Sequence, residues 1–247
     1  MKSSSKILGV GSYLPSGVVD NLKLSEKVDT SDEWITSRTG IKARRIANEK
    51  EATSDLAVKA AQNALIDARL TAQDIDLIIV ATITPDMAFP STACLIQHKL
   101  GIPKVASFDI EAACSGFLYA LDVADGMLSS NRYKCALVVG AEKLSSIMDW
   151  EDRTTCVLFG DGAGAVLLEP NDNGLGIQDS ILKSDGSGRE FLHMKAGGAV
   201  KPASHATIDS REHFVFQDGQ PVFKAAVKNM ADVSEKIMKK NNLSADD

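Results

Sequence analysis

Cys114 has the sequence context of a cysteine nucleophile. It follows an apolar, strand-like run at 105–110 and precedes residues 117–128, whose apolar side chains recur mostly at three- and four-residue steps. The thiol therefore falls at the first turn of a helix, where unpaired N–H groups and the helix dipole favour the thiolate. Small residues on both sides leave room for a substrate carbonyl. The local sequence leaves open the alternative that Cys114 is a small buried hydrophobe.

The elements that must position this cysteine alternate along the chain. Apolar runs typical of buried strands are separated by helical patterns, which predicts a mostly parallel sheet covered on both faces. A long amphipathic helix is expected near the end of the chain. The expected strands are 77–82, 105–110, 136–140 and 175–182, and the expected helices are 56–70, 92–100, 117–128 and 221–240.

The composition is that of an ordinary globular protein of 247 residues, with 44% hydrophobic and 24% charged residues. The sequence holds no run of about 18 apolar residues that could span a bilayer, and no signal peptide is expected. A net charge of −6 argues against non-specific nucleic-acid binding. Four widely spaced cysteines without a CxxC pair argue against zinc and a disulfide framework and suit a reducing cytoplasm.

Two glycine-rich segments are rejected as phosphate-binding loops. Residues 160–164 lack the lysine of a P-loop and lead into a strand-like run. Gly9 and Gly11 lack the third glycine of a dinucleotide-binding fingerprint. Both segments are better explained by close backbone packing beside the site. The remaining cysteines, Cys94, Cys135 and Cys156, lie in apolar contexts and are expected in the core.

Five segments resemble those of the thiolase-like condensing enzymes, and specifically of β-ketoacyl-acyl-carrier-protein synthase III. The nucleophile segment is residues 112–117 (AACSGF). The others are residues 9–15 (GVGSYLP), 29–41 (DTSDEWITSRTGI), 88–94 (AFPSTAC) and 159–165 (FGDGAGA). They occur in the family's order, and the resemblance covers essentially the whole chain.

The resemblance implies an α/β, thiolase-like fold with a pseudo-duplicated, layered αβαβα arrangement. Residues 1–170 resemble the whole first half, which carries the nucleophile, and residues 171–247 resemble only the beginning of the second half. The family completes its site with a histidine and an asparagine from that second half. None of the four histidines here, His98, His193, His205 and His213, has the family's context. The sequence is therefore expected to be an N-terminal portion of a longer enzyme.

The resemblance also assigns a binding site for the nucleotide end of CoA. Trp34 would stack on the adenine, Arg38 and Thr39 would contact the nucleotide, and Arg153 would lie on the other side of the base. An indole face suits a flat base and a guanidinium suits phosphate. The alternatives are an exposed helix with Trp34 at its edge and an ordinary surface ion pair for Arg153.

Further residues are assigned by resemblance to the acyl and carrier-protein sides of the site. Phe89 would cross a dimer interface into the partner's acyl pocket, or else lie in the core. Gly219 and Phe223 would line the pantetheine tunnel, beside Gln217, where relatives often have an apolar residue. Lys224 and Lys228, one turn apart, could dock the acidic carrier protein or simply face solvent, and Arg44 and Arg45 are weaker candidates.

The activity implied is condensation of a short acyl-CoA primer, such as acetyl-CoA, with malonyl-acyl carrier protein through an acyl group on Cys114, which starts a fatty acid chain. A homodimer is implied, with no cofactor beyond the CoA thioester substrate, no metal, and no nucleic-acid or membrane partner. Without the histidine and asparagine, this chain alone is expected to condense poorly. Two alternatives stay open: a secondary-metabolism relative with another acyl acceptor, and a non-catalytic remnant that binds CoA.

Overall fold

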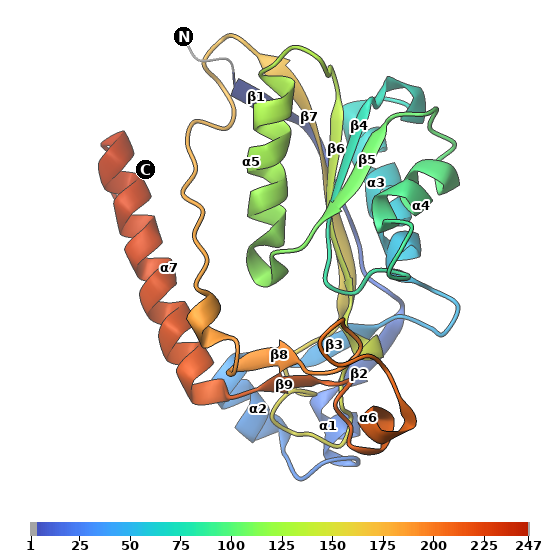
Figure 1. Cartoon of the computed structure of the whole chain (residues 1–247). Helices are drawn as coiled ribbons and strands as arrows, with labels where there is room; N and C mark the ends of the chain where they lie inside the picture. Colours follow the sequence, from blue (N-terminus) through green and yellow to red (C-terminus); the bar gives the residue numbers. More distant parts are fainter. Residues whose placement is uncertain (1–3, 247) are drawn as a thin grey trace. The chain divides into compact units, whose positions relative to one another are not determined.

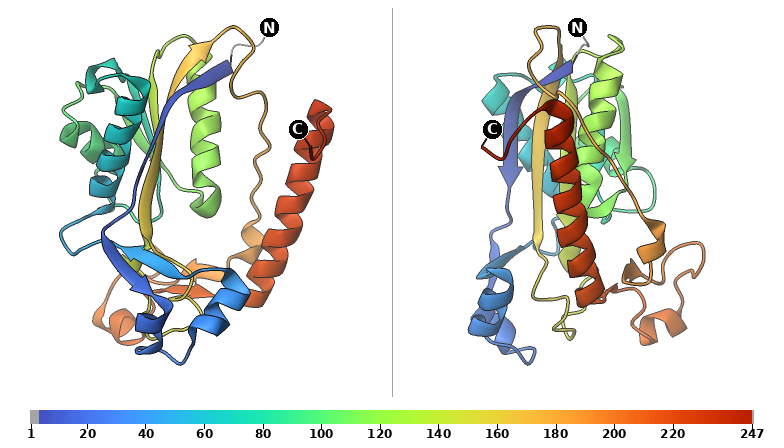
Figure 2. Two further views of the ribbon diagram at one scale, coloured as in Figure 1. Left: turned by 180° about the vertical axis from the view of Figure 1, so that it is seen from behind. Right: turned by 90° about the vertical axis from the view of Figure 1, so that its left-hand side faces the viewer.

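The computed structural model describes residues 4–246. The whole chain is drawn in Figures 1 and 2, and its contacts divide it into two compact units. The first unit comprises Met1–Val19, Arg44–Ser146 and Gly160–Gln178, and the second comprises Asp20–Ala43, Ile147–Phe159 and Asp179–Asp247. These units are defined by contacts between residues. The expected division at residue 170 instead separates two related halves of a duplicated fold, so the contacts do not test it.

The first unit is built on a five-stranded sheet in the order β1-β7-β6-β4-β5. β4 pairs in parallel with β5 and β6, while β7 runs antiparallel to both β6 and β1. Only β7 is reversed, so the predicted mostly parallel sheet is confirmed. The elements of this unit are β1 (Ser4–Tyr13), β4 (Leu77–Ala81), β5 (Ala106–Ile110), β6 (Ala136–Lys143), β7 (Asp161–Asn171), α3 (Thr53–Ala68), α4 (Thr92–Lys99) and α5 (Gly116–Leu128).

Helices cover both faces of this sheet: α3 and α4 lie on one face and α5 on the other (Figure 1). The strand side chains alternate between two cores. Ile78 and Val80 of β4 belong to the core under α3, whereas Leu77 and Ile79 belong to the core under α5. Burial on both faces explains why the strands are continuous apolar runs in the sequence.

Gly9 and Gly11 allow β1 to lie directly against α3. A Cβ atom built on Gly9 would lie 2.7 Å from the Ala64 carbonyl oxygen, and one on Gly11 would lie 2.2 Å from the Ala60 carbonyl oxygen. Both distances are far below van der Waals contact. The interpretation of these glycines as close backbone packing is therefore confirmed, and the partner is α3, on the sheet face opposite α5.

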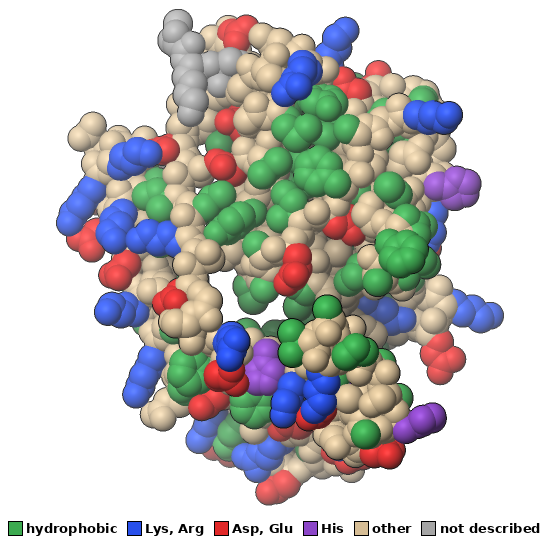
Figure 3. All heavy atoms as spheres, viewed as in Figure 1, with side chains coloured by type: hydrophobic (Ala, Val, Ile, Leu, Met, Phe, Trp, Pro, Cys, Tyr) green, Lys and Arg blue, Asp and Glu red, His purple; other side chains and the backbone are tan. Residues whose placement is uncertain are grey.

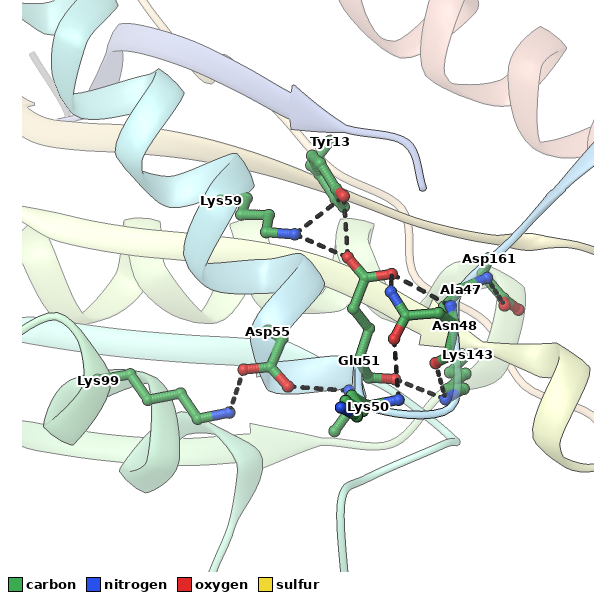
Figure 4. Close-up of polar contacts among 11 residues, drawn as sticks. Tyr13, Ala47, Asn48, Lys50, Glu51, Asp55, Lys59, Lys99, Lys143 and Asp161 are labelled. Carbon is green, nitrogen blue, oxygen red and sulfur yellow. Dashed lines mark hydrogen bonds and ion pairs between the residues drawn. The ribbon is translucent and has the colours of Figure 1, made fainter. Parts of the chain in front are cut away.

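A polar network fixes the turn before α3 (Figure 4). Lys59 Nζ donates hydrogen bonds to Glu51 Oε1 (2.7 Å) and Tyr13 Oη (2.9 Å). The hydrogen bond between Lys59 and Glu51 lowers the pKa of Glu51 and raises the pKa of Lys59 to about 12. From the end of β6, Lys143 Nζ donates to the carbonyl oxygens of Asn48 (3.0 Å) and Glu51 (2.6 Å). Residues 48–51 are thus held against the carboxyl end of the sheet.

The second unit is made of short elements and one long helix. β8 pairs with β9 in an antiparallel two-stranded sheet, and the predicted late helix is confirmed as α7. Although α7 is amphipathic, none of its 23 residues is buried, and Phe223 and Met230 are 69% and 70% exposed. The elements of this unit are α1 (Asn21–Ser25), α2 (Asp32–Thr39), β8 (Leu192–Met194), α6 (His205–Asp209), β9 (Val215–Gln217) and α7 (Gly219–Asn241). β2 (Gly17–Asp20) and β3 (Ala43–Ile46) form a separate two-stranded sheet, most of which belongs to the first unit.

The structure differs from expectation at residues 175–182 and at Cys94. Residues 175–182 form no strand. Gly174 and Gly176 have φ of 73° and 108°, which breaks an extended conformation at its start, and Ile177 makes a single backbone hydrogen bond, to Ser5. Cys94 is exposed and not in the core, because α4 buries Ala93 and Ile96 and the next position along the helix from Ala93 is rotated away from that face. Cys135 and Cys156 are buried as expected.

Within residues 4–246, every helix is either too short or too polar to cross a lipid bilayer.

Candidate active site

The structure places Cys114 at the junction between a strand and a helix, as predicted. β5 ends at Ile110, a single 3-10 turn spans Ala113–Ser115, and α5 begins at Gly116. The Cys114 side chain is exposed, which excludes the alternative of a buried core cysteine. A thiol at the start of a 13-residue helix lies where the helix dipole stabilises negative charge. The geometry suits a nucleophile open to an incoming carbonyl.

The turn that carries Cys114 contains a residue with unusual backbone geometry. Ala113 has φ of 44°, in the left-handed region. For a residue with a Cβ atom this conformation costs about 1–2 kcal/mol. Such strain is typical of functional sites, where the surrounding structure holds a residue in place. No feature of the local sequence predicted it, because alanine is usually a helix former.

Phe89 lies in the loop between β4 and α4 and is 84% exposed, which excludes the alternative that it lies in the core. Two carboxylates fix this loop. Asp86 accepts hydrogen bonds from the backbone N (2.8 Å) and the hydroxyl (2.6 Å) of Ser54. Asp109 of β5 accepts from the backbone N atoms of Thr92 (2.6 Å) and Ala93 (2.8 Å) at the start of α4. An exposed phenylalanine on a firmly anchored loop is well suited to contact another chain.

In the second unit, the residues expected at the nucleotide end of CoA come together around Trp34 of α2. The Arg38 guanidinium lies 4.5 Å from the centroid of the indole ring, and the Arg153 guanidinium lies 4.8 Å from it. Arg153 also pairs with Asp29, with 3.3 Å between Nη1 and Oδ2. These segments are more than a hundred residues apart in the chain, so the fold creates a cluster of one aromatic and two cationic side chains.

Thr39, at the end of α2, has a hydroxyl that is already engaged. It donates to the carbonyl oxygen of Ile35 (2.7 Å) and accepts from the backbone N of Ile41 (3.0 Å). The single hydroxyl hydrogen is therefore used within the protein. A contact between Thr39 and a ligand would involve its methyl group or the remaining acceptor capacity of its oxygen.

α7 carries four of the expected residues. Gly219 opens the helix, and Phe223, Lys224 and Lys228 are exposed on it. Figure 3 shows lysine and arginine side chains gathered over α7. The side chain of Gln217, at the end of β9, is half-buried.

Arg44 and Arg45 are the two weaker docking candidates, and the prediction for Arg44 is wrong. It is 4% exposed and its guanidinium donates to the Val19 carbonyl oxygen (3.2 Å), so it cannot serve as a surface docking residue. Arg45 is exposed and donates to the Pro15 carbonyl oxygen (3.2 Å).

Across the described residues, 4–246, no group of three or more histidine, cysteine, aspartate and glutamate side chains is arranged to hold a metal ion. Of the histidines, His205 is exposed while His193 and His213 are half-buried. Sequence patterns missed Glu142 near the end of β6, whose carboxylate accepts three hydrogen bonds from residues 82–84. A short-range pattern cannot reveal this contact, because about 60 residues separate the partners.

Comparison with known proteins finds one family repeatedly. Residues 108–186, which include Cys114, match the family model of 3-oxoacyl-[acyl-carrier-protein] synthase III. A β-ketoacyl-[acyl-carrier-protein] synthase III from Caldanaerobacter subterraneus subsp. tengcongensis is 51% identical over 246 residues, covering 100% of this chain and 74% of that protein.

Two solved structures extend the comparison. 3-Oxoacyl-[acyl-carrier-protein] synthase III from Aquifex aeolicus has a TM-score of 0.87 at 47% identity, covering 97% of this chain and 73% of that one. The priming β-ketosynthase of the R1128 polyketide biosynthetic pathway has a TM-score of 0.85 at 33% identity, covering 98% of this chain and 71% of that one.

Proposed function

Because this chain belongs to the β-ketoacyl-acyl-carrier-protein synthase III family, we propose that Cys114 is the nucleophile through which it condenses a short acyl-CoA with malonyl-acyl carrier protein. The protein is a condensing enzyme of fatty acid initiation. The observation that carries the assignment of Cys114 is its exposed thiol at the start of α5. Residues 1–170 would form the first of two related halves, and residues 171–247 the beginning of the second.

The reaction has two steps. In the first, the Cys114 sulfur attacks the thioester carbonyl carbon of the acyl-CoA, the bond from that carbon to the CoA sulfur breaks, and CoA leaves as a thiolate that takes up a proton. In the second, the malonyl group loses CO₂, and the resulting carbanion attacks the acyl-cysteine carbonyl. The Cys114 thiolate then leaves, and the product is a β-ketoacyl-carrier protein. The start of α5 favours negative charge on sulfur at both the beginning and the end of this cycle.

The cluster around Trp34 would bind the nucleotide end of CoA. Its indole offers a stacking surface for adenine, the Arg153 guanidinium would lie on the other side of the base, and the Arg38 guanidinium offers charge and hydrogen bonds for phosphate. Thr39 would contribute packing at the end of α2. Gly219 and Phe223 at the start of α7 would line the path of the pantetheine arm.

Phe89 would insert into the acyl pocket of a second copy of the chain. Its 84% exposure on an anchored loop supports a contact outside its own subunit, since a large apolar side chain gains free energy by leaving water. The assembly would be a homodimer in which each subunit limits the size of the primer in the other.

Intact mass spectrometry after incubation with acetyl-CoA tests the assignment of Cys114. We expect a mass gain of one acetyl group, and we expect that gain to be absent from Cys114→Ser. No adduct in a folded sample would contradict the acylation step and favour a non-catalytic CoA-binding remnant. An adduct that persists in Cys114→Ser would place the nucleophile elsewhere.

Lys224 and Lys228 would dock the acidic carrier protein. We expect the double charge reversal Lys224→Glu/Lys228→Glu to weaken binding of carrier protein and to leave acylation by acetyl-CoA unchanged, because opposite charges on a surface control association more than chemistry. Surface plasmon resonance against carrier protein measures the first effect and intact mass the second. Lys50→Glu/Lys104→Glu, with the same change in net charge, is the control. A parallel loss of carrier binding and acylation, or equal weakening by the control, would contradict the docking role.

The similarity to the priming β-ketosynthase supports one alternative, namely transfer of the acyl group to a different acceptor in secondary metabolism. A panel of acyl-carrier acceptors distinguishes the two functions. Preference for the fatty acid carrier supports the leading proposal, and preference for another carrier supports the alternative.

A further inference from the structure

The carboxyl ends of three adjacent strands lie next to the turn that carries the nucleophile. Ala81 of β4 is paired with Ile110 of β5 on one side and with Gly140 of β6 on the other. The three strands are parallel, so the segments that follow them emerge at the same edge of the sheet. The turn bearing Cys114 follows Ile110, and Glu142 lies two residues beyond Gly140.

The segment carrying Cys114 contacts these strand ends both before and after the cysteine. Before it, the Ile110 carbonyl oxygen accepts a hydrogen bond from the backbone N of Thr82 (3.3 Å). After it, a Cβ atom built on Gly116 would lie 3.1 Å from the Ala81 Cβ atom, and one built on Gly140 would lie 3.3 Å from the Phe117 ring. The position of Cys114 therefore depends on where residues 81 and 82 lie.

Glu142 fixes the residues that follow Ala81. Its carboxylate accepts hydrogen bonds from the backbone N of Ile83 (2.9 Å), from Thr82 Oγ1 (3.4 Å) and from Thr84 Oγ1. Thr82 Oγ1 also accepts from the backbone N of Thr84 (3.0 Å), and Thr84 Oγ1 accepts from the backbone N of Lys143 (2.9 Å). Each hydroxyl has one hydrogen, which is thus available for Glu142.

The Glu142 side chain lies on the sheet face that α5 covers. Side chains two residues apart on a strand share a face, so Glu142 lies on the same side as Gly140, against which Phe117 of α5 packs. Ala141, between them, belongs to the opposite core under α3. Burial raises the pKa of Glu142 while its hydrogen bonds lower it. An acidic group in this setting is costly unless its partners are held in place.

We propose that Glu142 is a positioning residue for Cys114, which it holds through residues 82–84 and the carboxyl end of β4. This inference rests on the proposed function, in which Cys114 is the nucleophile. Loss of the Glu142 contacts would free residues 82–84 to move. The hydrogen bond from Thr82 to Ile110 and the packing of Gly116 against Ala81 would then be weakened. The thiol would then move relative to the start of α5.

Alkylation by iodoacetamide tests this role without any thioester chemistry. Cys94 and Cys114 are both exposed, so peptide mass spectrometry gives the rate at Cys114 relative to the rate at Cys94 within one sample. Glu142→Gln removes the acceptor charge, and Thr84→Val removes one donor without changing any charge. Asp76→Asn is the matched control, because Asp76 accepts from the backbone N atoms of Lys134 (2.8 Å) and Cys135 (3.0 Å) before β6.

We expect the ratio of the alkylation rates at Cys114 and Cys94 to fall about threefold in Glu142→Gln and in Thr84→Val. This is the size of effect expected when a thiolate moves away from the N-terminus of a helix and loses its stabilisation by the helix dipole. Because both substitutions break the same set of contacts, the ratio in the double variant should be no lower than in either single variant. Asp76→Asn should leave the ratio unchanged. An unchanged ratio in folded Thr84→Val, or effects that multiply in the double variant, would overturn the proposal, and Thr84→Val alone decides if Glu142→Gln does not fold. Failure of acylation by acetyl-CoA with a changed ratio would overturn the proposed function but leave the positioning role.

Discussion

At the scale of single residues, the contact between Arg153 and Trp34 has a consequence for ligand binding. The guanidinium lies 4.8 Å from the indole centroid, whereas a base between the two needs about 7 Å, or two van der Waals contacts. An adenine that stacks on this face must therefore displace Arg153. The ion pair with Asp29 that holds it is exposed, and pairs of this kind are weak.

We expect Trp34→Ala to weaken CoA binding roughly tenfold, because stacking of one base on an aromatic ring is worth about 1–3 kcal/mol. Isothermal titration calorimetry with CoA measures the effect. Trp34→Phe keeps an aromatic face and should retain most of the affinity. Equal losses in the two variants, or no loss in Trp34→Ala, would contradict the stacking role.

Residue-scale prediction from sequence succeeded where the chemistry is local. The position of Cys114 follows from an apolar run, small residues and a helical period, which all lie within about 25 residues. The left-handed backbone of Ala113 and the contacts of Glu142 were not predictable in this way. Both depend on neighbours that the fold brings from elsewhere in the chain.

At the scale of secondary structure elements, the difference between α7 and residues 175–182 is instructive. A helix satisfies its backbone hydrogen bonds internally, so the amphipathic pattern at 221–240 predicted α7 (Gly219–Asn241) to within two residues at either end. A strand needs a neighbour to pair with. Residues 175–182 have an extended-type sequence but are not paired as a strand in the described structure, and apolar pattern alone could not reveal this.

The Asp179 carboxylate binds the C-terminal end of α7 through two hydrogen bonds. Asp179 accepts hydrogen bonds from Lys240 Nζ (2.8 Å) and Asn241 Nδ2 (2.9 Å). The hydrogen bond from Lys240 contributes most to lowering the pKa of Asp179 from 3.8 to about 2. The folded pKa lies below the unfolded one. The stabilisation is therefore complete above the unfolded value and is lost as the pH falls towards about 2.

NMR titration of the Asp179 carboxyl carbon checks this tie. We expect a pKa of about 2 in the unaltered protein and a higher pKa in Lys240→Met, which removes the charged donor. Lys239→Met is the matched control, because Lys239 pairs with Glu235 instead, and it should leave the Asp179 titration unchanged. An Asp179 pKa near 3.8 in the unaltered protein would show that the contact does not form in solution.

At the scale of the whole molecule, each of the two units has large apolar side chains exposed on its surface. In the first unit, Figure 3 shows hydrophobic side chains gathered over α5, where Leu118 is 61% exposed. In the second, the apolar stripe of α7 includes Val227, which is 55% exposed. The family relative from Caldanaerobacter has about a quarter of its length outside the match. Apolar faces of this extent typically mark surfaces that contact other protein.

The same 247 residues lack the histidine and asparagine context that the resemblance to the family assigns to holding the enolate oxygen. Loss of one such donor typically costs about 10²–10³ in rate. We therefore expect this chain to be acylated weakly at Cys114 and to form hardly any β-ketoacyl product with malonyl-carrier protein, as measured by mass spectrometry of the carrier.

Fusion to the remaining segment of the Caldanaerobacter relative should restore condensation, because that segment would supply the donors and cover the apolar faces. The control is the same fusion in which the histidine that the resemblance assigns to the site is replaced by alanine. It should recover solubility and acylation but not condensation, which separates the repair of the fold from the repair of the site. β-Ketoacyl product formed at a normal rate by the unfused chain would mean that the residues already present hold the enolate.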